Sequence, residues 1–328
     1  MTRAALALTL AGLLALPPPA AAYLKLTAPG GVTLRWNRSP VRYFVADRGV
    51  PGVSAADFRA AVDRAFATWE AVPTASVTFQ FAGFTGSAPF QADNLPVLGF
   101  ENRPDLDRVL GATRFVIDLV SGEIVESDIF FNSSFAWSTA SGGEAGRFDL
   151  ESVALHEIGH FIGLGHSALG ETEVRAIGGR RVLASGAVMF PISFGAGNTA
   201  DRQLQADDIA GVSDLYPDGN FRQNTGAARG RVSRNGQPVF GAHVVAFNPE
   251  TGNLIGGFSI NEDGQFEIAG LTPGSHVVRV EPLDDADVDS FFTSNRTDIE
   301  FQVTFHDRLF VAPSGGVGER FEVRVRPK

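Results

Sequence analysis

Apolar residues recur at the three- and four-residue spacing of an amphipathic helix in residues 54–73, 150–162 and 205–215. Ser54 is the expected N-cap of the first helix, and Asp149 is the expected N-cap of the second. The apolar stripe of the first helix consists of Phe58, Val62, Ala65, Phe66 and Trp69. The residues of the third helix that are expected to face inward are Leu204, Ile209, Val212 and Leu215. Each stripe predicts a helix that packs one face against a core.

Alternation of apolar and polar residues predicts strands before and between these helices. The expected strands are residues 32–36, 41–45, 77–81, 97–100, 113–119 and 124–132. From Ala228 onward the chain consists of short alternating runs separated by turn residues such as Asn235-Gly236 and Pro273-Gly274. That spacing predicts an all-β sandwich, and the polar stretch 218–226 before it is typical of a linker.

The first 22 residues have the layout of a secretory signal. Arg3 supplies a positive charge, an apolar run extends from Ala4 to Leu16, and Ala20-Ala21-Ala22 forms a cleavage-site pattern. The apolar run is too short to span a bilayer, and no later stretch is long and apolar enough to do so. The chain contains no cysteine. We therefore expect a disulfide-free exported protein, extracellular or periplasmic, of the kind found in bacteria.

Composition and length limit which classes of partner and how many domains are expected. The chain has 328 residues, of which 44% are hydrophobic and 20% are charged, an ordinary globular profile. This length favours two domains that each bury a core. The formal net charge of −10 argues against nucleic acid as a partner.

The candidate chemistry is concentrated in residues 155–166, in which residues 156–166 follow the pattern H-E-x-x-H-x-x-G-x-x-H. His156 and His160 lie four residues apart, so on a helix both imidazoles project from one face toward one metal ion. Gly163 can adopt a left-handed conformation that ends the helix, so that the chain turns back and brings in His166. Three imidazoles and one open position are typical of a catalytic zinc site, because a structural site has a fourth protein ligand.

Glu157, next to the first histidine, is placed to act as a general base. The predicted reaction is peptide-bond hydrolysis, in which zinc activates a water molecule and Glu157 transfers its proton to the leaving amine. The structural alternative is a buried amphipathic helix whose histidines are core residues, but the complete motif favours the metal site. Apart from Met1, Met189 is the only methionine, and a zinc motif followed by a methionine turn is the metzincin signature.

Further segments resemble the catalytic domain of matrixin-type metzincins. They are Leu34-Arg35-Trp36, Phe66 to Glu70, Ser127 to Asn132, Ser167, Val188-Met189-Phe190-Pro191 and Asp207-Asp208-Ile209. The resemblance covers residues 24–217. It implies an α+β zinc endopeptidase fold with a twisted mixed sheet and three helices, which acts on protein or peptide substrates.

The resemblance also implies roles for individual segments. Met189 would lie beneath the three zinc ligands as a structural floor. Residues Phe190 to Gly197 would line the pocket for the side chain just beyond the scissile bond. The strand near Ile124–Asn132 would be the edge strand against which an extended substrate pairs.

Three features depart from the matrixin pattern. Without cysteine, the thiolate latch of matrixin propeptides is absent, and strands begin soon after residue 23, which leaves little room for a propeptide. All histidines before residue 220 belong to the zinc motif, so the second, structural zinc site of many matrixins cannot be built. The 22 residues between His166 and Met189 are long for the family and are expected to form a loop or hairpin over the site.

Residues 226–283 resemble the carboxypeptidase regulatory-like, transthyretin-like β-sandwich. The segments that carry this likeness are Arg229 to Val232, Gly241 to Val244 and Gly264 to Gly274. The remaining histidines, His243, His276 and His306, are expected to be ordinary strand or loop residues. The acidic cluster of Asp284, Asp285, Asp287 and Asp289 could hold calcium, but it lacks the glycine and closing glutamate of an EF-hand loop, which favours a solvated turn.

Two hypotheses follow for a chain divided into a signal peptide (1–22), a zinc peptidase domain (23–217), a linker (218–226) and a β-sandwich (227–328). The first is a secreted endopeptidase with one catalytic zinc. The second is an exported binding or adhesion protein in which the sandwich binds a partner of unknown identity and the zinc domain is a scaffold. Glu157 favours the first, because a scaffold has no need of a general base.

Overall fold

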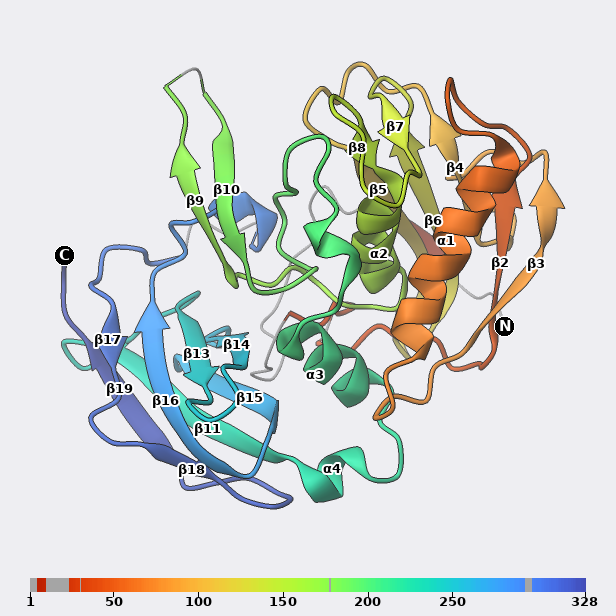
Figure 1. The fold of residues 1–328 in the computed structure, drawn as a ribbon. Coiled ribbons are helices and arrows are strands. Elements are labelled where there is room, and N and C mark those ends of the chain that lie inside the picture. Colours follow the sequence, from red (N-terminus) through yellow and green to blue (C-terminus); the bar gives the residue numbers. More distant parts are fainter. Residues whose placement is uncertain (1–4, 10–23, 30, 177, 293–296) are drawn as a thin grey trace.

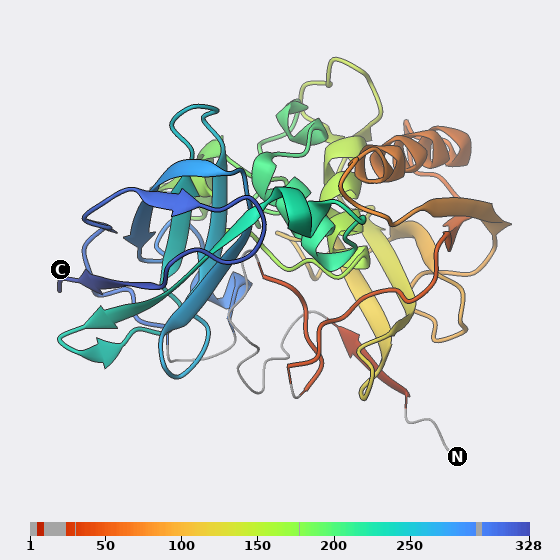
Figure 2. The same ribbon diagram turned by 90° about the horizontal axis from the view of Figure 1, so that it is seen from below.

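The computed structural model describes residues 5–9, 24–29, 31–176, 178–292 and 297–328 (Figure 1). The expected signal peptide at 1–22 lies outside these residues except for β1, Ala5–Thr9. Residues 24–217 form one region around a six-stranded sheet, and residues 226–328, here called the C-terminal β region, lie beside it. Figure 2 shows the two regions side by side with the helices of residues 206–224 between them. No helix formed by the described residues is both long and apolar enough to cross a lipid bilayer.

The sheet of the first region has the strand order β1-β5-β6-β4-β2-β3. Its strands after β1 are β2 (Val41–Ala46), β3 (Phe79–Thr85), β4 (Val97–Glu101), β5 (Gly111–Asp118) and β6 (Ile124–Asn132). The sheet is mixed, because β5 is antiparallel to both neighbours while the other pairs are parallel. The strand expected at 32–36 does not form and makes only isolated bridges. Its Trp36 instead donates a hydrogen bond from Nε1 to Phe161 O, which holds this segment against a helix end.

The expectation that residues 124–132 form the edge strand is wrong. Strand β6 lies inside the sheet, with β4 on one side and β5 on the other. The short connection after β5 folds back at Gly122, whose φ of 73° favours glycine, so β5 and β6 form a hairpin in which β6 is the inner strand. Only β1 lies beyond β5, antiparallel to residues 114–118.

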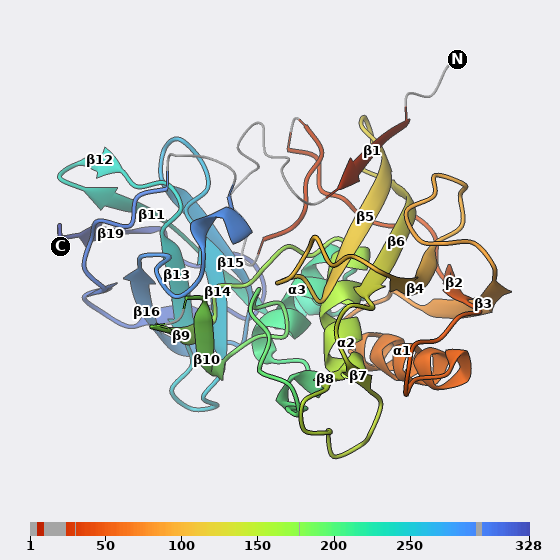
Figure 3. The same cartoon turned by 90° about the horizontal axis from the view of Figure 1, so that it is seen from above.

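Three α-helices cover this region: α1 (Ala55–Glu70), α2 (Leu150–Phe161) and α3 (Ala206–Leu215). Figure 3 shows α1 and α2 against one face of the sheet. The expected caps are confirmed, because Asp57 N donates to Ser54 Oγ and Ser152 N donates to Asp149 Oδ2. The expected inward position of Ile209 is wrong, since its side chain is 37% exposed.

Several short elements complete the first region. They are β7 (Trp137–Ser138), β8 (Phe148–Asp149), β9 (Gly170–Val174), β10 (Arg180–Ser185) and η1 (Ala200–Arg202), with α4 (Phe221–Asn224) following α3. The stretch between His166 and Met189 forms the antiparallel β9–β10 hairpin. In Figure 1 this hairpin projects upward above the C-terminal β region.

The C-terminal β region consists of two sheets. One contains β11 (Gly226–Arg234), β12 (Gln237–Pro238), β15 (Gln265–Leu271) and β19 (Phe321–Val325). The other contains β13 (His243–Phe247), β14 (Leu254–Phe258), β16 (Gly274–Glu281), β17 (Thr304–Phe305) and β18 (Phe310–Ala312). Both sheets contribute to one buried cluster, which is compatible with the expected β-sandwich. The helical turn η2 (Val288–Ser290) lies between β16 and β17 in the chain.

An apolar cluster joins the two regions. Ala168 and Phe190 of the first region are buried together with side chains of the C-terminal β region. Those partners are Phe258, Ile260, Leu283, Ala286, Phe291 and Phe292. The two regions therefore share buried surface beside the histidine motif, which tends to fix their relative position.

Candidate metal centre

Helix α2 carries the first two histidines of the motif and ends just after them. Leu164 N donates to Gly159 O at 2.9 Å and Gly163 N donates to His160 O at 2.7 Å, the two bonds of a Schellman motif. Gly163 has the expected left-handed conformation, with φ of 105°. The reversal that this glycine permits brings His166 back toward the helix.

The three histidines come together in space. Their ring centroids lie 4.8 Å apart for His156 and His160, 5.4 Å for His156 and His166, and 4.7 Å for His160 and His166. One nitrogen from each ring lies within 4.8 Å of the others. The Nε2 atoms of His160 and His166 are only 3.2 Å apart.

Backbone carbonyls orient all three rings through Nδ1. His156 Nδ1 lies 2.7 Å from Val188 O, His160 Nδ1 lies 2.8 Å from Leu164 O, and His166 Nδ1 lies 2.6 Å from Ser290 O. A carbonyl only accepts hydrogen bonds, so each neutral ring carries its proton on Nδ1 and leaves Nε2 as a free lone pair. The short approach of two Nε2 atoms is therefore not a hydrogen bond.

The site fits a zinc ion. Burial lowers the pKa of all three histidines, and the neighbouring imidazoles add to this for His156 and His160, so that the pKa of His156 falls to about 3. The rings are therefore neutral near pH 7, as metal ligands must be. Four-coordinate zinc with nitrogen ligands holds them about 3.3 Å apart, close to the spacing of His160 and His166. Buried lone pairs facing one another at this distance favour a cation between them.

Glu157 lies beside this cluster, buried and held by one side chain of the sheet. Thr113 Oγ1 is 2.7 Å from Glu157 Oε2 and 3.1 Å from its backbone oxygen. Burial raises the pKa of Glu157 to about 7, and the Thr113 hydrogen bond opposes this shift. A Cβ atom at Gly111 would lie 3.2 Å from Glu157 Oε1, so the missing side chain there leaves space at that oxygen. The sequence carried no signal for Thr113, because its partner lies 44 residues away on another element.

Comparison with known proteins agrees with this geometry. The matrixin family model matches residues 35–217, more than half of the chain. The chain belongs to the matrixin family. The family implies a catalytic zinc, and the histidine triad of the structure lies within the matched residues.

Individual relatives are named as metalloendoproteinases or collagenases. The chain is 29% identical over 199 residues to metalloendoproteinase 1-MMP of Arabidopsis thaliana, covering 56% of this chain and 44% of that protein. It is 30% identical over 174 residues to metalloendoproteinase 1 of Glycine max, covering 48% and 45%. It is 28% identical over 205 residues to interstitial collagenase of Oryctolagus cuniculus, covering 60% and 36%. The chain thus spans less than half the length of these curated relatives.

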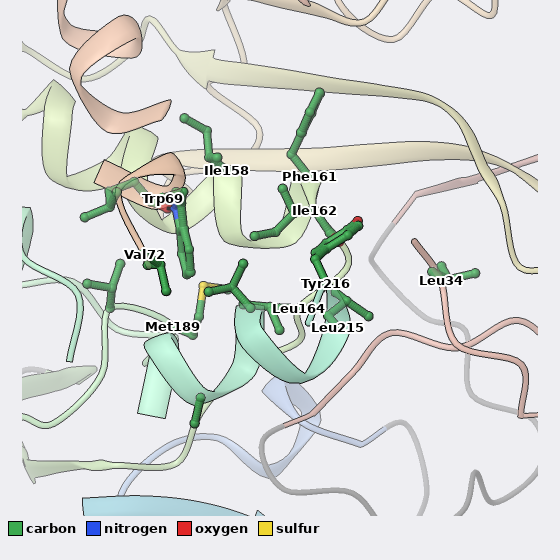
Figure 4. Packing of buried hydrophobic residues seen from close by; sticks show 14 of the residues in the cluster. Leu34, Trp69, Val72, Ile158, Phe161, Ile162, Leu164, Met189, Leu215 and Tyr216 are labelled. Atoms are coloured by element: carbon green, nitrogen blue, oxygen red, sulfur yellow. Dashed lines mark hydrogen bonds between the residues drawn. The ribbon is translucent and has the colours of Figure 1, made fainter. Parts of the chain in front are cut away.

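Within the matrixin region, residues 35–217, Met189 packs beneath α2. Figure 4 shows its sulfur facing Trp69 near Leu164. A Cβ atom at Gly159 would lie 2.1 Å from Met189 Sδ, so only glycine lets the helix approach this closely. Asp208 holds the turn that carries Met189, accepting from Val188 N at 2.8 Å and Met189 N at 3.1 Å.

Asp207, the neighbour of Asp208 on α3, faces the C-terminal β region. Its Oδ2 accepts from Ser167 Oγ at 2.6 Å, and its Oδ1 accepts from Gly256 N of β14 at 2.8 Å. Burial raises its pKa to about 7, and the Ser167 hydrogen bond opposes the shift. The Asp207-Asp208 pair was recognised in the sequence only as part of the family likeness, and nothing local indicated that the two carboxylates point to different regions.

Proposed function

We propose that this chain is a zinc-dependent endopeptidase in which His156, His160 and His166 hold the metal and Glu157 is the general base. The observation that carries the proposal is the convergence of three imidazoles, each with Nδ1 on a carbonyl, beside a buried carboxylate. When bound, zinc supplies a Lewis acid that activates water and polarises the peptide carbonyl. The names of the relatives agree with this activity.

Residues of the protein itself transfer the proton from water to the leaving amine. Thr113 donates to Glu157 Oε2 and so fixes the carboxylate in one orientation. This leaves Oε1, beside Gly111, as the atom that accepts a proton from water and delivers it to the leaving amine. Met189 and the turn held by Asp208 support the histidines from below.

The substrate is proposed to bind along the outer edge of β5. Gly111 and Thr113 place this strand next to Glu157, and residues 111–113 lie beyond the part of β5 that pairs with β1. The pairing of β1 with residues 114–118 supports the idea that this edge accepts an added strand. Phe190 to Gly197 were expected to line the pocket beyond the scissile bond, but Phe190 is buried in the cluster that joins the two regions, so the proposed lining is Pro191 to Gly197.

The division of the chain is part of the proposal. Residues 1–22 would direct export to the extracellular space or periplasm, 23–217 would form the peptidase domain, 218–226 the linker and 227–328 a carboxypeptidase regulatory-like β-sandwich. The two-sheet arrangement of β11–β19 supports the last assignment. Calcium has no assigned site.

The test compares wild type with Glu157→Gln, which keeps the size and the Thr113 contact but removes the base. Both proteins are incubated with a peptide library, with and without chelator, and their zinc content is measured. We expect wild type to cleave peptides until chelator is added, and the variant to bind zinc with cleavage reduced about 100- to 10,000-fold. Cleavage by Glu157→Gln at the wild-type rate would refute the role of the glutamate, and a wild type without bound zinc would refute the metal site.

A further inference from the structure

The third histidine of the motif is held by the C-terminal β region. Its Nδ1 lies 2.6 Å from the backbone oxygen of Ser290, 124 residues further along the chain. The carbonyls that hold His156 and His160, from Val188 and Leu164, both belong to the matrixin region. One of three equivalent contacts therefore crosses between the two regions.

Ser290 presents its carbonyl because it is the last residue of η2. Ser290 N donates to Asp287 O, and Phe291 N and Phe292 N both donate to Val288 O. The carbonyls at the end of such a turn have no partner within it, so they bond to groups outside. His166 provides that partner.

Buried aromatic side chains fix the position of this carbonyl. Phe291 follows Ser290, is 6% exposed, and has its ring 6.2 Å from the His166 ring in an edge-to-face arrangement. Phe291 and Phe292 both pack on Phe258 of β14, with centroid distances of 5.8 and 5.6 Å. The backbone between these anchors and η2 has little freedom to move away from the histidine.

The β9–β10 hairpin holds the same segment from the other side. Thr172 N donates to Asp285 Oδ1 at 3.0 Å, and Thr172 Oγ1 donates to Asp285 O. Arg180 Nη1 donates to Thr172 Oγ1 at 2.9 Å and its Nε lies 3.8 Å from Asp287 Oδ1. The long connection between His166 and Met189 thus contacts the loop that carries Ser290.

We propose that residues 283–292 of the C-terminal β region, held by the β9–β10 hairpin, complete the metal centre by positioning His166. This inference rests on the proposed zinc site. The Ser290 carbonyl keeps the His166 proton on Nδ1 and keeps Nε2 directed at the metal. Ser290 acts as a positioning residue through its backbone, and the C-terminal β region is required for retention of the metal.

The first test uses the full-length zinc protein and the variants Phe291→Ala, Phe291→Leu and Phe310→Ala. Phe310, at 5% exposed, matches Phe291 in burial but pairs with β16 at His276, away from the histidine motif. The readouts are the rate of zinc release to a chromogenic chelator and the visible absorption spectrum of the cobalt-substituted protein. The cobalt spectrum reports on the metal ligands themselves, and Phe310→Ala controls for zinc release caused by a general loss of stability.

We expect Phe291→Ala to release zinc about 10- to 100-fold faster and to alter the cobalt spectrum, as loss of an outer hydrogen-bond partner does at other metal sites. Phe291→Leu should restore most of the wild-type behaviour, and Phe310→Ala should change neither readout. Wild-type release and spectrum in a folded Phe291→Ala protein would overturn the inference while leaving the zinc site intact. A wild type that binds no zinc would instead overturn the proposed function.

If Phe291→Ala does not fold, a second pair of variants tests whether residues 283–292 position His166. Asp285→Ala removes the side-chain contact to Thr172, whereas Asp284→Ala removes only an exposed pairing with Lys328 at 3.2 Å. We expect faster zinc release in Asp285→Ala and wild-type release in Asp284→Ala. Equal release from the two variants would overturn the inference.

Discussion

Asp207 and Asp208 are adjacent buried carboxylates of α3, yet they hold opposite sides of the proposed metal centre. Asp208 binds the backbone of Val188 and Met189, and the carbonyl of Val188 in turn orients His156. Asp207 binds Ser167, the residue after His166, and reaches Gly256 of the C-terminal β region. The contacts of Asp208, here called the Asp208 side, lie within the matrixin region. The contacts of Asp207 and of the neighbouring His166, here called the Asp207 side, join the matrixin region to the C-terminal β region.

The difference shows how one helix can serve two purposes. On the Asp208 side, the supporting contacts connect residues about 20 to 32 positions apart, all within the residues that the family model matches. On the Asp207 side, the contacts to Gly256 and Ser290 come from residues beyond the family match, which ends at 217. We therefore expect damage to the first side to affect the whole matrixin region, and damage to the second to loosen the connection between regions.

The largest effect is expected for Asp208→Ala. It leaves the backbone N–H groups of Val188 and Met189 buried without an acceptor and removes the acceptor of Gln205 N at the start of α3. Each such group costs about 1–3 kcal/mol, so the free energy of unfolding should fall by about 3–5 kcal/mol. Chemical denaturation with and without zinc measures this loss of unfolding free energy. A smaller loss for Asp208→Ala than for Asp207→Ala would contradict the larger structural role assigned to Asp208.

Gly159→Ala should follow, because the added methyl group would meet Met189 Sδ at 2.1 Å and Trp69 at 3.0 Å. Overpacking of this kind costs about 1–3 kcal/mol. Combining it with Met189→Ala, which makes room, should cost less than the sum of the two single changes. Additive losses in denaturation experiments would show that the helix does not rest on this methionine.

Asp207→Ala should cost about 1–3 kcal/mol, since it leaves Ser167 Oγ and Gly256 N without their acceptor. Its distinctive consequence is a separation of the two regions, so calorimetry should resolve two unfolding transitions where wild type shows more cooperative unfolding. Asp208→Ala should lower the transition of the matrixin region without separating the regions. The same calorimetric trace from both variants would contradict the separate roles of Asp207, in joining the two regions, and Asp208, in stabilising the matrixin region.

Measured per pH unit, the smallest effect is a pH dependence from a third buried carboxylate, Asp128 of β6, which accepts from Phe90 N and Val97 N. Burial, with nearby Glu126 and Asp93, raises its pKa to about 7, while the hydrogen bonds from Val97 N and Phe90 N oppose the shift. An acid whose pKa is raised on folding binds more protons in the folded state. Stability should therefore fall as pH rises from about 4 to about 7, by at most about 1.4 kcal/mol per pH unit from this group.

Asp128→Asn removes that titration and should flatten the pH dependence of unfolding between about pH 4 and 7. Titration of Asp128 followed by NMR gives the pKa directly. An ordinary aspartate pKa for Asp128 would contradict this prediction. It would leave the comparison between Asp207 and Asp208 unchanged, because Asp128 contacts neither the Asp207 side nor the Asp208 side.

Local patterns in the sequence were sufficient for the helices and for the histidine motif. The caps Ser54 and Asp149 and the glycine turn at Gly163 depend on neighbouring residues, and the structure confirms each of them. The four-residue spacing of His156 and His160 places both on one helical face in any environment. The assignment of the metal and of the base remains a prediction that the proposed experiments test.

Other features depended on which elements meet. The sequence pattern of residues 124–132 is that of a strand, but whether that strand lies at an edge depends on β5 folding back beside it. The apolar side chain of Ile209 suggested an inward position, but the buried carboxylates of α3 turn it outward. Periodicity reports which residues share a face, and only packing decides what that face meets.

The sequence by itself determined the histidine motif, the helix that carries it, and the contrast between the helical and strand pattern of residues 24–217 and the strand pattern that follows. Only the tertiary structure decided that Thr113 holds Glu157 and that Ser290 holds His166. The physical reason is that helical and turn preferences act over a few residues, whereas these hydrogen bonds join residues 44 and 124 positions apart.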